Sequence, residues 1–214
     1  MVTQHSVLPM PRTPLLGREA ELAAVQALLL REEVGLVTLT GAGGSGKTRL
    51  AIAAARAAAG AFPDGGFFVD LAPLSEPDLI PATVAAALGV REAGGQPLLA
   101  TIARFLLGRR LLLVIDNCEH LLAGVPAIAE LLAQCERLTV LATSRAPLRL
   151  SGEHELTVPP LALPETGASA SADSLLASPA VALFCARAQA VRADFALNDT
   201  NAADVVAICR RLDG

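Results

Sequence analysis

The octapeptide GAGGSGKT, residues Gly41 to Thr48, decides how this 214-residue sequence is expected to fold. It matches the pattern GxxxxGK[ST], whose glycines let the backbone curl around a phosphate group. The preceding residues 35–40 (GLVTLT) are typical of a short buried strand, and residues 47–60 are strong helix formers. A strand, a glycine-rich loop and a helix in this order predict a phosphate-binding loop in which the helix presents its positive end to the anion.

Lys47 is the only lysine among the 17 lysines and arginines of the chain. A compact ammonium on a flexible stem can bridge the β- and γ-phosphates from inside the loop, whereas the planar guanidinium is larger and prefers a flat bidentate partner. Guanine-specific P-loop proteins read their base with an [NT]KxD motif, which a single lysine in the loop excludes. We therefore expect an adenine nucleotide, ATP or ADP, as the ligand.

Two further charged residues stand where apolar strands are predicted to end. Asp116 closes LLLVID (111–116), and Arg145 follows LTVLATS (138–144). The carboxyl ends of parallel strands meet at one edge of a sheet, where ligands bind. We expect Asp116 and the Thr48 hydroxyl to hold Mg²⁺ and Arg145 to sense a γ-phosphate.

Strands and helices alternate along the chain, which predicts an α/β fold with a parallel sheet covered on both faces. The expected strands are 35–40, 66–71, 111–116, 138–144 and 156–158. The expected helices are 18–31, 47–60, 77–88, 97–107, 120–134, 179–191 and 201–212.

The chain is expected to divide into four parts. Residues 1–13 form a Pro-rich leader, residues 14–163 the nucleotide-binding domain, residues 164–178 a linker rich in small residues, and residues 179–214 the beginning of a truncated helical domain.

Composition argues against several other classes of function. Aromatic residues make up 3% of the chain, there is no Trp or Tyr, the net charge is −4, and the arginines are scattered, so we expect no direct nucleic-acid contact. Charged residues interrupt every apolar run, and no signal peptide begins the chain, so we expect no membrane span and a cytoplasmic location. The four cysteines form no CxxC pair, and DNCEH (116–120) lacks zinc spacing.

Four segments together resemble the STAND class of P-loop NTPases, in particular the NB-ARC-like ATPase module of bacterial LuxR- and SARP-type transcriptional regulators. They are PLLGREAEL (14–22), TLTGAGGSGKTRLA (38–51), LLLVIDNCEH (111–120) and TSRAPLRLSGEHELTVPPL (143–161). The resemblance implies a three-layer P-loop fold with sheet order 5-1-4-3-2 and Arg145 as the sensor arginine. It also implies a small helical domain, and LDG (212–214) resembles the first part of a motif of that domain.

The resemblance also implies the residues that bind the nucleotide. Leu15, Leu16 and Arg18 would line the adenine pocket, although the two leucines could equally form a hydrophobic staple ahead of the first helix. The phosphate-binding residues would be Gly41, Ala42, Gly43, Gly44, Ser45, Gly46, Lys47, Thr48 and Arg49. We further expect effector and sensor domains in the full-length protein as partners, with a possible nucleotide-dependent oligomer.

Asn117 departs from the pattern of hydrolytic relatives, which place Glu directly after the strand-ending Asp to polarise the attacking water. An amide cannot take a proton, and Glu119 is the nearest carboxylate. We expect a switch that binds ATP and ADP and hydrolyses ATP weakly at most, with Lys47, Asp116, Glu119 and Arg145 as the catalytic candidates.

Two alternative functions stay open. One is an active AAA+-type oligomeric ATPase, which needs an arginine finger from a neighbouring subunit. The other is a small-molecule kinase, for which the sequence shows no Arg-rich lid segment.

Overall fold

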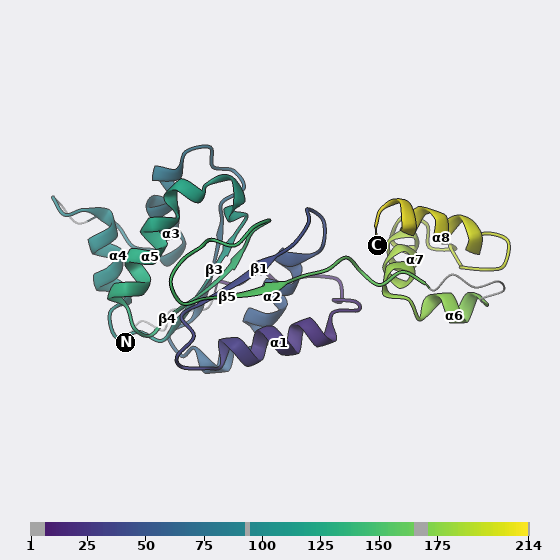
Figure 1. Cartoon of the computed structure of the whole chain (residues 1–214), viewed down its shortest axis with the longest axis horizontal. Coiled ribbons are helices and arrows are strands. Elements are labelled where there is room, and N and C mark those ends of the chain that lie inside the picture. The colour runs from purple at the N-terminus through teal and green to yellow at the C-terminus, as the bar shows by residue number, and fades with distance from the viewer. Residues whose placement is uncertain (1–6, 93–94, 165–170, 214) are drawn as a thin grey trace. The chain divides into compact units, whose positions relative to one another are not determined.

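A parallel sheet of five strands organises residues 20–158 in the computed structural model, which describes residues 7–92, 95–164 and 171–213 (Figure 1). The strand order is β2-β3-β4-β1-β5, and every neighbouring pair is parallel. Read from the other edge, this is the predicted order 5-1-4-3-2, which is confirmed. The strands are β1 (Leu36–Thr40), β2 (Gly66–Asp70), β3 (Leu111–Asp116), β4 (Leu138–Thr143) and β5 (Glu153–Thr157).

The central strands are continuous apolar runs because both of their faces are covered. Every residue of β1, β3 and β4 is buried, whereas β5, at one edge, has no buried residue. The sequence EHELT of β5 accordingly carries charged side chains that an interior strand could not accommodate. This explains why the pattern at 156–158 gives only the end of the strand.

Helices cover the two faces of the sheet, which produces the predicted three layers. On one face, α3 (Ile80–Leu88), α4 (Leu98–Leu106) and α5 (Val125–Gln134) share a core with alternate side chains of β3. Figure 1 shows α1 (Glu19–Leu29) and α2 (Lys47–Ala57) on the other face. Because the strands are parallel, the carboxyl ends of β1, β3 and β4 lie at the same end of the sheet.

Three predicted helices differ from the structure by three residues or more at one end. The helix expected from residue 120 begins at Val125 because Pro126 occupies its first turn, and two short 3₁₀ turns precede it, η3 (Cys118–His120) and η4 (Leu122–Gly124). Turns η2 (Pro77–Leu79) and η1 (Ala59–Ala61) likewise replace the start of the helix at 77–88 and the end of the helix at 47–60. A 3₁₀ turn is a common terminus for an α-helix.

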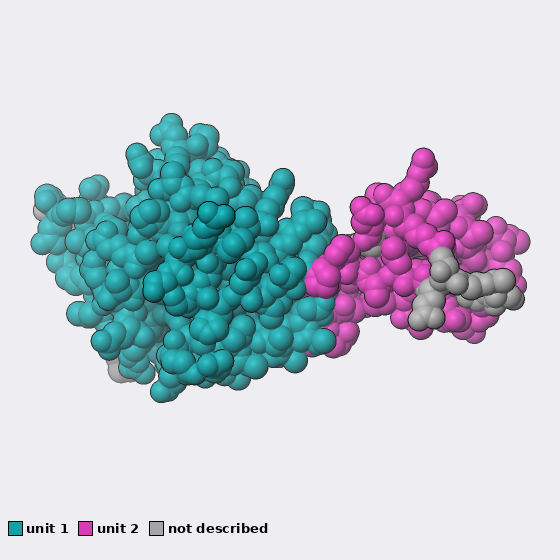
Figure 2. Space-filling model, viewed as in Figure 1, with its two compact units in different colours: residues 1–13, 20–158 teal, residues 14–19, 159–214 magenta. Residues whose placement is uncertain are grey.

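The described chain forms two compact units (Figure 2). One contains residues 1–13 and 20–158, and the other contains residues 14–19 and 159–214. Segment 14–19 joins the second unit because the Arg18 guanidinium donates to the Pro159 carbonyl at 2.5 Å. Gly17 also approaches Pro179 so closely that a Cβ at position 17 would collide with its ring. These contacts are invisible in the sequence since they join segments about 140 residues apart.

The second unit is helical and has its own core. Its helices are α6 (Ala172–Leu176), α7 (Pro179–Val191) and α8 (Ala202–Arg211). Val181, Cys185, Val205 and Cys209 are buried together in a core between α7 and α8. Helix α6 lies inside the predicted linker 164–178, where Ser171 caps it by accepting from the Ser174 backbone amide at 3.3 Å. Residues 165–170 of that linker, and Gly214 of the LDG segment, lie outside the described residues.

Part of the predicted leader lies against the sheet. The Val7 amide donates to the Gly66 carbonyl at 2.9 Å, and Val7 forms a parallel bridge with Phe67 of the edge strand β2. Residues 1–6 of the leader lie outside the described residues. No helix in the described ranges combines the length and the apolar character that crossing a membrane requires.

Candidate phosphate and metal site

The GAGGSGKT loop joins β1 to α2 and adopts a conformation that depends on glycine. Gly46 has φ of +89°, in the left-handed region that other residues rarely adopt. A Cβ at Gly44 or Gly46 would meet nothing within 4 Å, so the space that these residues face is open. Gly46 caps α2 without any side-chain hydrogen bond, and no capping side chain therefore competes with an anion at the helix N-terminus.

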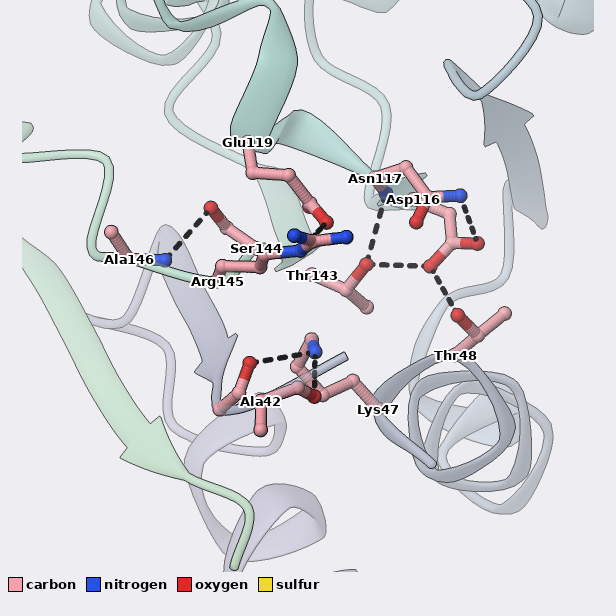
Figure 3. Close-up of polar contacts among 11 residues, drawn as sticks. Ala42, Lys47, Thr48, Asp116, Asn117, Glu119, Thr143, Ser144, Arg145 and Ala146 are labelled. Atoms are coloured by element: carbon pink, nitrogen blue, oxygen red, sulfur yellow. Dashed lines mark hydrogen bonds and ion pairs between the residues drawn. The ribbon is translucent and has the colours of Figure 1, made fainter. Parts of the chain in front are cut away.

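Lys47, the first residue of α2, is held inside this loop (Figure 3). Its side chain is nearly buried, and Nζ donates to the carbonyl oxygens of Gly41 and Ala42, each at 2.8 Å. Burial lowers the pKa of Lys47, nearby Glu119 and Asp116 oppose that shift, and Arg145 adds to it. The loop thus presents a partly desolvated ammonium, which gains from an anionic partner.

Asp116, at the end of β3, receives two hydroxyl donors on one oxygen (Figure 3). Thr48 Oγ1 donates to Asp116 Oδ1 at 2.8 Å, and Thr143 Oγ1 donates to the same oxygen at 2.5 Å. Asp116 is only 4% exposed, so both its position and its orientation are fixed by these contacts. A carboxylate and a hydroxyl are hard oxygen ligands of the kind Mg²⁺ takes in nucleotide sites, and this pair therefore fits the expected ion.

Thr143 and Asn117 also belong to this cluster, a position that the sequence motifs did not indicate. The backbone N–H of Asn117 donates to Thr143 Oγ1 at 3.0 Å, and its side-chain Nδ2 donates to Asp116 Oδ2 at 3.2 Å. Asn117 adopts φ of +63°, which an asparagine tolerates better than most residues. A signal was present in the sequence, since a threonine ending the strand beside the Asp116 strand has a side chain at the same sheet edge.

Arg145 and Glu119 meet across the same edge. Glu119 Oε1 accepts from Arg145 Nε at 3.1 Å, and Arg145 Nη2 would lie 3.7 Å from a Cβ placed on Gly43 of the phosphate loop. The Arg145 side chain is 68% exposed and that of Glu119 is 21% exposed. The structure therefore brings Lys47, Thr48, Asp116, Glu119 and Arg145 to one place.

Several other residues that the sequence predicts to bind the nucleotide make contacts elsewhere or lie in the second unit. Arg49 donates to Oγ1 and to the carbonyl oxygen of Thr13, at 2.9 and 2.8 Å, so its guanidinium contacts the leader segment. Leu15 and Leu16 are half-buried in the second unit, beside the buried Arg18. Their role in an adenine pocket, and the alternative of a hydrophobic staple, stay predictions.

The residues of DNCEH other than Asp116 make protein contacts. Burial raises the pKa of the Cys118 thiol to about 12, and Asp116 and Glu119 reinforce the shift. The ring of His120 lies within hydrogen-bond distance of the Leu71 and Leu74 carbonyls, at 3.1 and 3.0 Å. Within the described ranges, no group of three or more His, Cys, Asp or Glu side chains converges on a possible metal position.

Residues 30–157 match the protein family described as an AAA domain. Among curated proteins, the chain is 44% identical over 191 residues to a Mycobacterium tuberculosis protein named as an HTH-type transcriptional regulator, covering 89% of this chain and 20% of that protein. It is 32% identical over 152 residues to the regulatory protein AfsR of Streptomyces griseus, covering 63% of this chain and 16% of AfsR. The chain thus spans a fifth or less of these two relatives.

Two solved structures share the fold. The ORC2 protein of Aeropyrum pernix, solved as ADPNP–ADP complexes, aligns with a TM-score of 0.56 at 16% identity, over 85% of this chain and 54% of that one. A STAND protein with a tetratricopeptide repeat sensor from Pyrococcus horikoshii aligns with a TM-score of 0.52 at 15% identity, over 95% of this chain and 28% of that one.

Proposed function

We propose, on the premise that this chain belongs to the AAA domain family of P-loop NTPases, that it is the nucleotide-dependent switch module of a larger regulatory protein. It binds ATP and ADP with Mg²⁺ and hydrolyses ATP slowly or not at all. The family match agrees with the predicted P-loop NTPase, and the relatives named as regulators agree with the resemblance to LuxR- and SARP-type proteins. One observation carries the proposal: a buried lysine inside the loop stands beside a hydroxyl and carboxylate pair.

Phosphate binding follows from the chemistry of the loop. Lys47 Nζ now donates to two carbonyl oxygens, and a triphosphate offers it stronger, charged acceptors in the same place. The uncapped start of α2 adds backbone N–H groups and the positive end of the helix. These contacts recognise phosphate and supply affinity without selecting a base.

Thr48 and Asp116 would hold Mg²⁺, which supplies neutralisation of charge on the β- and γ-phosphate oxygens. The protein's part is to keep the two ligands converged, which it does through the 2.8 Å bond from Thr48 Oγ1 to Asp116 Oδ1. Thr143 Oγ1 donates to the same carboxylate oxygen and adds a second constraint on its position. Because Asp116 is buried, its charge needs compensation, which comes from these donors, from Asn117 Nδ2 and from the cationic groups nearby.

Slow hydrolysis is proposed because the residue after Asp116 is an amide. Asn117 Nδ2 donates to Asp116 Oδ2, so the side chain acts as a donor and offers no base to an attacking water. With hydrolysis slow, the identity of the bound nucleotide becomes the signal. A switch of this kind needs contacts that differ between the ATP and ADP states, and Arg145 is the proposed source of that difference.

The larger protein is proposed from the relatives, which are several times longer than this chain. Since one relative is named as an HTH-type transcriptional regulator, DNA-binding and sensor domains outside this segment are the proposed partners. An adenine base is proposed because the chain lacks the guanine-reading motif. Leu15, Leu16 and Arg18 are the proposed adenine contacts.

The deciding experiment identifies the nucleotide that the protein carries. The purified chain is denatured, the released nucleotide is identified by chromatography, and affinities for ATP and ADP are measured with Mg²⁺ by calorimetry. We expect ADP or ATP to be recovered and both to bind. If the folded protein binds neither nucleotide in the presence of Mg²⁺, the phosphate-site assignment is wrong.

An active oligomeric ATPase is the second candidate, favoured by the match to the AAA domain. The two proposals differ in turnover and in its dependence on protein concentration, because an arginine finger from another subunit acts only in an oligomer. Steady-state turnover well above about 1 s⁻¹, in the usual range of enzymes, supports the ATPase and excludes the switch. Turnover far below that rate at every protein concentration supports the switch.

A further inference from the structure

We propose that Glu119 is a positioning residue for Arg145 and thereby sets how strongly the site distinguishes ATP from ADP. This inference rests on the proposed function and assigns Glu119 a role other than the water-polarising base expected from its place in the sequence. It is carried by the contact between the two side chains and by the position of Arg145 beside the phosphate loop (Figure 3).

The guanidinium of Arg145 contacts Glu119 and also lies beside Gly43 of the phosphate loop. Nε donates to Glu119 Oε1 at 3.1 Å, while Nη2 is the atom nearest to the Cβ position of Gly43, at 3.7 Å. A guanidinium carries five N–H donors in a rigid planar fork, so holding it by Nε directs the Nη groups elsewhere without consuming them. Glu119 therefore holds the guanidinium by Nε beside the phosphate loop, with Nε itself 3.9 Å from the same Cβ position, and the Nη groups stay available to a phosphate.

The two partners differ in how well the protein holds them. Arg145 is 68% exposed and would otherwise sample many rotamers, whereas Glu119 is 21% exposed and stands in the short η3 turn behind the buried end of β3. Ordering a long side chain on ligand binding costs conformational entropy, unless the side chain is already ordered in the free protein. The less exposed carboxylate is thus placed to pre-organise the more exposed arginine.

The second carboxylate oxygen of Glu119 supports its role in positioning Arg145. Oε2 is buried and has no hydrogen-bond partner among the described residues. A buried carboxylate oxygen without a donor is energetically unfavourable. The charge of Glu119 therefore depends more on its contact with Arg145. The ion pair with Arg145 thus compensates a carboxylate whose second oxygen has no donor in the described part of the chain.

The consequence concerns only the γ-phosphate. ADP lacks the group that Arg145 would contact, so loss of Arg145 or of its orientation should weaken ATP binding and leave ADP binding unchanged. A residue that only polarised water would change turnover and leave the ratio of the two affinities as it is. A carboxylate acting only through its charge would repel the triphosphate, and its removal would tighten ATP binding.

The test measures Kd for ADP and for a non-hydrolysable ATP analogue, with Mg²⁺, on the full chain. Arg145→Ala is expected to weaken the analogue about tenfold, the effect of losing one hydrogen bond to a charged group, with ADP unchanged. Glu119→Ala should reproduce most of that loss, and the double variant should lose little more than Arg145→Ala alone. Glu119→Gln should recover part of it, because the amide oxygen still accepts from Nε.

Glu33→Ala is the matched control, since Glu33 forms an exposed ion pair with Arg31 at 2.8 Å in the same unit. It should leave both affinities unchanged. Thermal unfolding of each variant reports whether it folds, and Glu119→Gln, which keeps the side-chain shape, carries the test if Glu119→Ala does not.

Three results overturn the inference: a wild-type affinity ratio in Glu119→Ala and Glu119→Gln, a tighter ATP analogue in both, or equal weakening of ADP and the analogue. Failure of the wild-type protein to bind either nucleotide is a different outcome, because it refutes the proposed function itself.

Discussion

The two edges of the sheet hold charged side chains in opposite ways. At the amino ends of β1, β3 and β4 lies a cavity of about 330 Å³ whose lining combines apolar residues with arginines and glutamates. Its Arg31 pairs with Glu33 at 2.8 Å and its Arg110 with Glu32 at 3.3 Å, in exposed or half-exposed contacts. At the carboxyl ends, Lys47 and Asp116 are buried at 8% and 4% exposure and are held by carbonyl and hydroxyl groups.

The difference agrees with the proposed nucleotide site, because the buried charges lie at the carboxyl ends of the strands. Exposed ion pairs are solvated and need nothing further, whereas a buried ammonium and a buried carboxylate are expensive unless a partner or ligand compensates them. Strand geometry explains the asymmetry, because in open parallel sheets the loops after the strands gather at the carboxyl edge. Four predictions follow this contrast.

The largest expected effect separates the two edges by nucleotide affinity. Lys47→Ala should weaken ATP and ADP by about 100-fold or more, because the ammonium expected to donate to the phosphates is lost. Arg137→Ala, which removes a charge at the amino-edge cavity, should leave both affinities within about twofold of the wild type. Calorimetric titration with Mg²⁺ measures both, and equal losses in the two variants would refute the contrast.

Two threonines of β4 offer a matched pair. Thr143→Val removes the hydroxyl that bridges Asp116 and the Asn117 amide, and should lower the free energy of unfolding by about 1–3 kcal/mol and weaken Mg²⁺-dependent ATP binding about tenfold. Thr139→Val, at the amino end of the same strand, removes a hydroxyl that makes no hydrogen bond among the described residues, and should change stability by about 0.5 kcal/mol or less. Urea unfolding and titration with and without Mg²⁺ test both, and an equal effect would show that Thr143 is only a packing residue.

The ion pairs of the amino edge should contribute little. Arg110→Ala breaks the pair with the largely exposed Glu32 and should reduce the free energy of unfolding by about 1 kcal/mol or less, with a smaller loss at high salt. Denaturant unfolding at two ionic strengths measures it. A loss of several kcal/mol would mean that this edge also depends on its charges.

The smallest effect concerns Cys118, beside Asp116. A thiol whose pKa is raised from 9.0 to about 12 stays protonated in the folded state while the same thiol ionises in the unfolded chain. Its contribution to stability is therefore complete below about pH 9 and is lost as the pH rises toward 12. At pH 8 a thiol reagent should label Cys118 far more slowly in native than in denatured protein. Rapid native labelling, located by mass spectrometry, would contradict the buried thiol.

Local patterns predicted much of the fold because their signals lie within a few residues. The strand ending at Thr40, the glycine loop and the helix starting at Lys47 need no distant contact to be read. The strand order came from the resemblance, and the structure confirms it. The helix ends were less accurate, since Pro126 and the 3₁₀ turns before it decide where α5 starts.

The contacts between distant residues could not be predicted in the same way. Thr143 and Asp116 are 27 positions apart, and their bond depends on the register of β3 against β4. Arg49 stands beside the phosphate loop in sequence, yet its side chain binds Thr13 of the leader. Arg18 bonds Pro159 across 141 positions, which moves residues 14–19 into the second unit.

The sequence by itself determined the phosphate loop and the positions of Lys47, Thr48 and Asp116, because backbone conformation and strand propensity act locally. Only the tertiary structure decided which side chains face one another: Thr143 on Asp116, and Glu119 on Arg145. The physical reason is that strand register and turn geometry set side-chain direction, and both arise from packing the whole sheet.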